Sequence, residues 1–98
     1  MHTFSPKYTK SNLQKLELLF KEQEYTIRYE KGNFQSGYCV VQARKIAVIN
    51  KFFDTEARIN CLLDILSTII VMDNVMSAPS KTLYKSILKN EEYRANVA

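Results

Sequence analysis

Histidine, cysteine, glycine and proline are all scarce in this 98-residue chain, and each scarcity excludes a class of protein. The single histidine is His2, and the two cysteines, Cys39 and Cys61, stand far apart. Zinc is bound mainly by histidine and cysteine, which are too few here unless distant carboxylates join them, so we expect no metal and no cofactor. The same cysteine spacing excludes a disulfide scaffold. With only 2 Gly and 2 Pro, the chain also lacks the composition of a long disordered linker.

The chain lacks a long apolar run as well. Its longest apolar stretch, residues 61–72, is interrupted by Asp64, Ser67 and Thr68 and is too short to cross a bilayer of ~30 Å. The first seven residues have no apolar core of the kind that a secretory signal needs. We therefore expect a cytoplasmic protein with no membrane partner.

Charge is present but unevenly distributed. Residues 1–53 hold nine Lys/Arg against four Asp/Glu, whereas residues 54–98 hold five against six, within a net charge of +4. An anionic partner would therefore face mainly the first half, although a solvated surface is the commoner reason for such a surplus. The 46% hydrophobic and 24% charged fractions are typical of one folded domain spanning residues 1–98.

The first half has the spacing of a helix followed by three strands. Ser11 and Gln14 form a capping-box pattern, which predicts a helix over residues 11–23 after an arm at residues 1–10. Alternation of apolar and polar residues predicts a strand over residues 25–30, followed by a hairpin of residues 38–41 and 46–49. The last strand is apolar on both faces, which indicates a central position or cover on both sides.

The second half predicts two helices. Asp54 or Thr55 is expected to cap a helix over residues 56–72, whose polar stripe is Asn60, Asp64 and Ser67. So wide an apolar arc needs the sheet on one flank and a neighbouring helix or a second subunit on the other. The last helix is expected over residues 81–90, before a fraying tail at residues 91–98, with these inward side chains: Leu83, Tyr84, Ile87 and Leu88.

The expected fold is therefore a single α+β domain with the order α-β-β-β-α-α. The three strands are predicted to form an antiparallel meander packed against the helices.

Candidate catalytic groups are few. Neither cysteine has an internal histidine to generate a thiolate, so both are expected to be small core residues. Asp64, on a largely covered helix, would need a hydrogen-bond donor from another element, unless its stripe faces water. The candidate pocket is the following set: Asn33, Tyr38, Asn50 and Asp64. A small-molecule enzyme would use Asp64 or Cys39.

A basic surface is the second kind of candidate site. Lys81, Lys85 and Lys89 repeat every four residues and so form one stripe on the last helix. A second basic patch is expected on the sheet and its connections, with aromatic residues among the cations that suit stacked bases. Its cations are Arg28, Lys31, Lys45 and Lys51, and its aromatic residues are Tyr29, Phe34 and Tyr38. The chain has no Gly-rich phosphate cradle and no RNA-recognition sheet motif.

Two stretches carry a resemblance to known proteins: residues 29–39, YEKGNFQSGYC, and residues 48–51, VINK. They resemble a family of small uncharacterised bacterial proteins, a likeness that implies no activity. The order of a Gly-Tyr strand, a hairpin, a strand ending in Ile-Asn and an Arg-led helix is also similar to the minimal core of zincin-type metallopeptidases. Those enzymes carry His-Glu-x-x-His on the helix, where this chain has Leu63-Asp64-Ile65-Leu66-Ser67. The resemblance thus implies a shared framework without zinc and without any catalytic residue.

The missing catalytic set favours a non-enzymatic cytoplasmic protein-interaction module. We expect it to be a homodimer, because a domain this small buries only about 60–65% of its unfolded surface and gains by covering a leftover apolar face. Two alternatives stay open: a weak nucleic-acid-binding protein that uses the basic stripe, and a small-molecule enzyme that uses Asp64 or Cys39.

Overall fold

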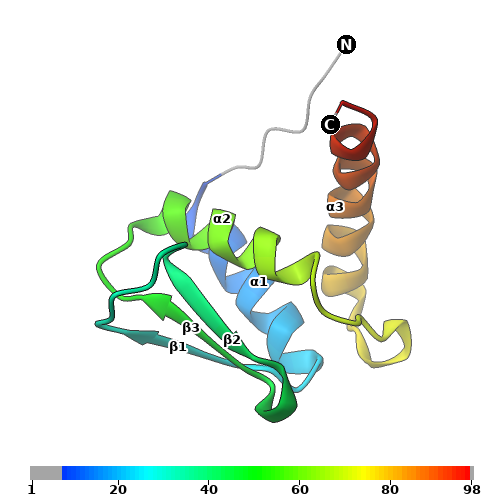
Figure 1. The fold of residues 1–98 in the computed structure, drawn as a ribbon. Helices are drawn as coiled ribbons and strands as arrows, with labels where there is room; N and C mark the ends of the chain where they lie inside the picture. The colour runs from blue at the N-terminus through cyan, green and yellow to red at the C-terminus, as the bar shows by residue number, and fades with distance from the viewer. Residues whose placement is uncertain (1–7, 98) are drawn as a thin grey trace.

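Three helices and three strands make up residues 8–97, the part of the chain that the computed structural model describes (Figure 1). Side chains are described as far as Lys89. The predicted α+β class and element order are confirmed, whereas the predicted arm lies mostly outside the described residues. The elements are α1 (Lys10–Glu22), β1 (Thr26–Glu30), β2 (Tyr38–Val41), β3 (Ile46–Asn50), α2 (Thr55–Leu66) and α3 (Ala78–Val97), with 3-10 turns at Gln42–Arg44 and Asp73–Val75.

The sheet is mixed, and the predicted antiparallel meander is wrong. The strand order is β1-β3-β2, with β1 parallel and β2 antiparallel to β3. The connection at residues 31–37 passes the end of β3. Lys51 N, just after β3, donates to Glu30 O at the end of β1 (3.1 Å), and Asn50 N at the end of β3 donates to Gly37 O of the connection (2.9 Å). The strand that is apolar on both faces thus takes the central position, as its composition predicts.

Both α1 and α2 lie on the same face of the sheet (Figure 1). The strands direct six side chains toward these helices, and Ala47 and Ile49 of β3 are fully buried there. The opposite face, here called the outer face, has no helix against it in the described part of the chain. The outer face carries Thr26, Arg28, Cys39, Val41, Ile46 and Val48.

Helix α1 begins earlier than predicted and ends, as predicted, at about Gln23. Its N-cap is Thr9, not Ser11, because Thr9 Oγ1 accepts a hydrogen bond from Asn12 N at 3.1 Å. At the other end Glu24 has a positive φ of 64°, Glu24 N donates to Lys21 O, and Tyr25 N donates to Phe20 O. This is a Schellman turn in which glutamate stands where glycine is usual. It reverses the chain and places β1 beside the helix that it follows.

Helix α2 ends at Leu66, six residues before the predicted end. Ser67 Oγ donates to Asp64 O and Thr68 Oγ1 donates to Ile65 O, both at 2.7 Å, so hydroxyl groups satisfy the last carbonyls. The six buried side chains of α2 face the sheet and α1. The wide apolar arc is therefore covered within one chain, by the neighbouring helix rather than by a second subunit.

The segment between α2 and α3 is held by the end of α1. Gln23 is buried, and its side-chain amide makes two hydrogen bonds with the backbone of Met72: Nε2 donates to Met72 O (3.0 Å) and Met72 N donates to Oε1 (2.7 Å). Ser77 N donates to Glu22 Oε1 at 3.1 Å. Burial raises the pKa of Glu22, but hydrogen bonds from Ser77 and Ser80 outweigh that effect and leave the pKa lowered.

Helix α3 packs on α1 and is longer than predicted. It starts at Ala78, and its backbone is helical to Val97, across most of the expected tail. Ile87 is buried as predicted, but Leu88 is exposed, because only one narrow side of α3 meets the rest of the chain.

Candidate functional site at the sheet edges

The four predicted pocket residues do not come together at one place. Tyr38 and Asp64 meet directly, since the Tyr38 hydroxyl donates to Asp64 Oδ2 at 2.5 Å. Asn50 instead accepts a hydrogen bond from Phe52 N (3.0 Å) beyond the end of β3, and Asn33 is exposed in the connection between β1 and β2. Of the predicted pocket, only the hydrogen bond between Tyr38 and the exposed Asp64 carboxylate is formed.

Tyr38 and Cys61 have the electrostatics of structural groups. The hydrogen bond to Asp64, with burial and the nearby charge, raises the pKa of Tyr38 to about 12, so the phenol stays neutral. Burial, together with the Asp64 charge, raises the pKa of the Cys61 thiol, which disfavours a thiolate. Cys61 is buried as predicted, whereas Cys39 is exposed on the outer face, on the other side of the sheet from Asp64. The two residues of the enzyme hypothesis therefore face different surfaces.

The predicted cations are divided among separate surfaces. Lys81, Lys85 and Lys89 are all exposed on α3, which stands apart from the sheet (Figure 1). Lys45 and Lys51 lie at opposite ends of β3. Arg28 lies on the outer face and pairs with Glu30 at 2.5 Å. The lysine stripe exists as predicted, but the sheet-borne cations do not extend it.

Strand β2 forms one open edge of the sheet. Hydrogen-bonded and non-hydrogen-bonded residue pairs alternate along an antiparallel ladder. Asn50 N donates to Gly37 O, so Gly37 and Asn50 are a hydrogen-bonded pair and the next pair along β2 is not. Tyr38 and Val40 are the non-bonded positions, so their backbone groups point toward the open edge. Ser36 Oγ donates to Tyr38 O at 3.2 Å. The sequence of β2 is Tyr-Cys-Val-Val, without a single charge.

Strand β1 forms the other open edge. Thr26 N donates to Lys45 O (2.8 Å) and Lys51 N donates to Glu30 O, which marks Thr26 and Glu30 as bonded to β3. In a parallel pair bonded positions recur at every second residue, so the backbone groups of Ile27 and Tyr29 point toward the open edge.

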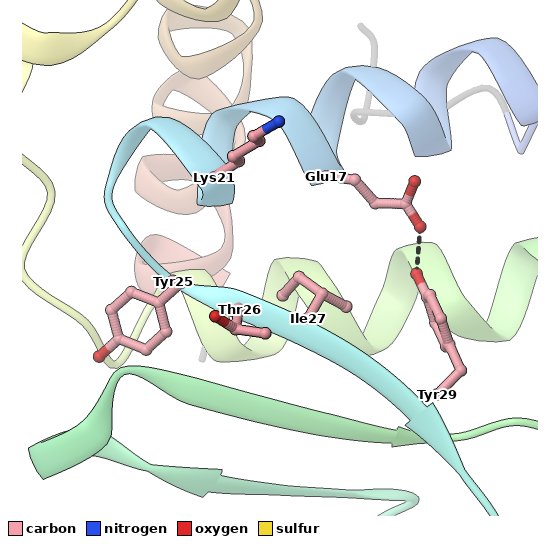
Figure 2. Close-up of a pocket in the computed structure, with 6 residues that line it drawn as sticks. All are labelled: Glu17, Lys21, Tyr25, Thr26, Ile27 and Tyr29. Carbon is pink, nitrogen blue, oxygen red and sulfur yellow. Dashed lines mark hydrogen bonds between the residues drawn. The ribbon is translucent and has the colours of Figure 1, made fainter.

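A groove runs between this edge and α1 (Figure 2). Its volume is ≈ 410 Å³, and we call it the α1–β1 groove, defined by Glu17, Lys21, Tyr25, Thr26, Ile27 and Tyr29. The Tyr29 hydroxyl donates to the Glu17 carboxylate at one end, and Tyr25 lies at the other. Burial, together with the bond to Glu17, raises the pKa of Tyr29, while the Arg58 guanidinium lies 4.1 Å from the ring centroid.

Sequence reasoning missed this groove, although part of the signal was present. Glu17 and Lys21 are four residues apart on α1, which predicts that they share one face of the helix. Ile27 and Tyr29 alternate on β1 and so share one face of the strand. The sequence did not show that β1 is an edge strand of the sheet or that it lies beside α1.

No protein-family model, no curated protein and no solved structure matches this chain. The geometry described above is therefore the basis for the proposals below. Among the described residues, no three His, Cys, Asp or Glu side chains gather as metal ligands. None of the described helices has the length and apolar character needed to span a bilayer.

Proposed function

We propose that this chain is a non-enzymatic protein-interaction module that forms a homodimer by pairing β2 with β2 of a second copy. The observation that carries the proposal is an edge strand without charge, since natural edge strands are usually protected by charged side chains or proline. We also propose the cytoplasm as its compartment, in keeping with two free thiols.

The backbone of β2 suits a two-fold antiparallel pairing. Tyr38 and Val40 carry the outward groups, so a two-fold axis at Cys39 lets Tyr38 of each copy bond to Val40 of the other. This register also keeps every side chain on its own face of the sheet. The result is a continuous six-stranded sheet with four new backbone hydrogen bonds.

The charge pattern favours β2 over β1 for self-pairing. The equivalent pairing of β1, with the axis at Arg28, would set two arginines directly opposite each other, which is destabilising. The β2 pairing instead brings Cys39 against Cys39 of the second copy. Because Cys39 would be a non-hydrogen-bonded pair, the two Cα atoms would lie about 4.5 Å apart.

Charge at Cys39 tests the pairing. Cys39→Glu and Cys39→Lys each place like charges across the axis, and we expect each to raise the dimer dissociation constant about tenfold, equivalent to ~1.4 kcal/mol. Mixing the two variants should restore dimers, because opposite charges then face each other. Analytical ultracentrifugation measures all three samples.

A charge on the other edge provides the control. Thr26 is exposed on the outer face of β1, so Thr26→Glu should leave the dimer unchanged. Circular dichroism verifies that each variant folds. A monomeric wild type at high micromolar concentration, or a Glu and Lys mixture that stays monomeric, would contradict the proposed pairing.

A further inference from the structure

The α1–β1 groove combines unpaired backbone groups with a shaped wall of side chains. Ile27 and Tyr29 present two N–H and two C=O groups at the open edge of β1. Their side chains point the other way, toward α1, and line the groove (Figure 2). Backbone hydrogen bonds at a strand edge and pockets for alternate side chains are what an extended peptide needs in order to bind by strand addition.

The size and burial of the groove suit side chains of such a peptide. A volume of ≈ 410 Å³ falls within the range of about 300–1,000 Å³ that is usual for ligand sites. Ile27 and Tyr25 are both partly buried against the core, so they offer a fixed apolar floor. The hydrogen bond between Tyr29 and Glu17 closes one end and fixes the aromatic wall.

The charged side chains that line the groove, Glu17 and Lys21, indicate which side chains a partner peptide should carry. Glu17 keeps its negative charge while it accepts the Tyr29 bond at one end of the groove, whereas Lys21 lies farther along α1 and is the cation of the groove that an acidic group of a ligand can meet (Figure 2). Lys21 is exposed and makes no ion pair within the described part of the chain. An acidic side chain beside an apolar one would therefore complement Lys21 and Ile27.

We propose that the α1–β1 groove binds an extended segment of another protein by strand addition to β1, with an acidic side chain of that segment on Lys21 and an apolar one over Ile27. This site is separate from the β2 edge, so the module would use one edge for its own copy and the other for a partner. A second copy fits the groove poorly, because it would set Arg28 against Arg28.

A pair of synthetic peptides tests the site on the 98-residue chain. The probe is a capped eight-residue peptide of alternating valine and threonine with one central aspartate, and its counterpart has lysine there. Amide chemical shifts should change at Ile27 and Tyr29, not at Tyr38 and Val40. We expect the aspartate peptide to bind about fivefold more tightly than the lysine peptide.

Two variants on α1 separate a specific contact from general attraction. Lys21→Glu should reverse the order of the two peptides, whereas Lys15→Glu, an exposed lysine of α1 outside the groove, should leave the order unchanged. A probe with N-methyl groups on alternate amides should not bind, because it cannot form the backbone bonds.

Four results would overturn the proposal. They are equal binding of both peptides, shifts at Tyr38 and Val40 alone, shifts of the Ile27 amide with protein concentration in the absence of peptide, and shifts of that amide on Phe4→Ala. The third result would assign the groove to a second copy, and the fourth to the chain's own first residues. None of them bears on whether Cys39 variants dissociate the dimer, so the two proposals fail independently.

Discussion

Replacing Gly37 with alanine should lower the free energy of unfolding by about 3 kcal/mol, through two separate causes. Gly37 has a φ of +90°, a backbone conformation that costs a residue with a Cβ atom roughly 1–2 kcal/mol. The new Cβ would also lie 2.4 Å from Cε2 and 2.5 Å from Cζ of the Phe53 ring, which is packed against the core. Moving a packed ring adds about 1–3 kcal/mol.

Gly32 provides a matched control for this prediction. A Cβ atom there would meet the Phe34 ring at 2.3 Å, but Gly32 has no positive φ and Phe34 is not part of the core cluster. Phe34 is therefore free to move aside, and Gly32→Ala should cost less than about 1 kcal/mol. Thermal unfolding followed by circular dichroism should separate the two variants by roughly 10 °C or more. Equal melting temperatures would refute the assigned role of Gly37.

Replacing Gln23 with leucine should cost about 2–4 kcal/mol, although leucine is apolar and similar in size. The buried Gln23 amide is the hydrogen-bond partner of both backbone groups of Met72. Leucine would leave that N–H and that C=O without a partner, at about 1–3 kcal/mol for each group that water does not reach. The connection between α2 and α3 would lose its main attachment to α1.

Gln14 lies on the exposed side of α1 and serves as the comparison. Gln14→Leu should change stability by less than about 0.5 kcal/mol, as is usual for surface positions. Urea unfolding measures both variants, and faster amide exchange at Met72 in the Gln23 variant should show that the loss is local. A Gln23→Leu protein as stable as the wild type would show that the two hydrogen bonds contribute nothing.

The sequence predicted the elements well and their arrangement in part. Local spacing is enough to place α1, the three strands and the start of α2, because each depends on neighbours along the chain. The pairing of strands depends on contacts far apart in sequence. Even so, the strand at Ile46–Asn50 is apolar on both faces, which correctly indicated that β3 is central. The predicted meander conflicted with this indication, because a meander places β2 in the centre.

One predicted helix end was wrong and one turn was not predicted, both for reasons of local chemistry. The helix predicted over residues 56–72 stops at Leu66, because the hydroxyls of Ser67 and Thr68 bond back to carbonyls and a β-branched run follows. The turn after α1 uses Glu24 with positive φ, where a sequence search looks for glycine.

The candidate sites were harder to predict than the fold. Sequence identified Tyr38 and Asp64 separately, and they do meet, but as a structural pair. The features that carry the proposals are the two open edges, and an edge is defined only once the strand order is known. Cys39 illustrates the point: its exposure follows from the uncovered outer face, which residue type alone does not reveal.

Hydrogen exchange at the two sheet edges tests the central claim most directly. Amide protection at Tyr38 and Val40 should rise as the protein concentration is increased from micromolar to millimolar, because those N–H groups find acceptors only in a second copy. Protection at Cys39 and Val41, which are bonded to β3, should stay constant, and Ile27 and Tyr29 should stay unprotected. Exchange at Tyr38 and Val40 that is the same at every concentration would contradict a homodimer built on β2.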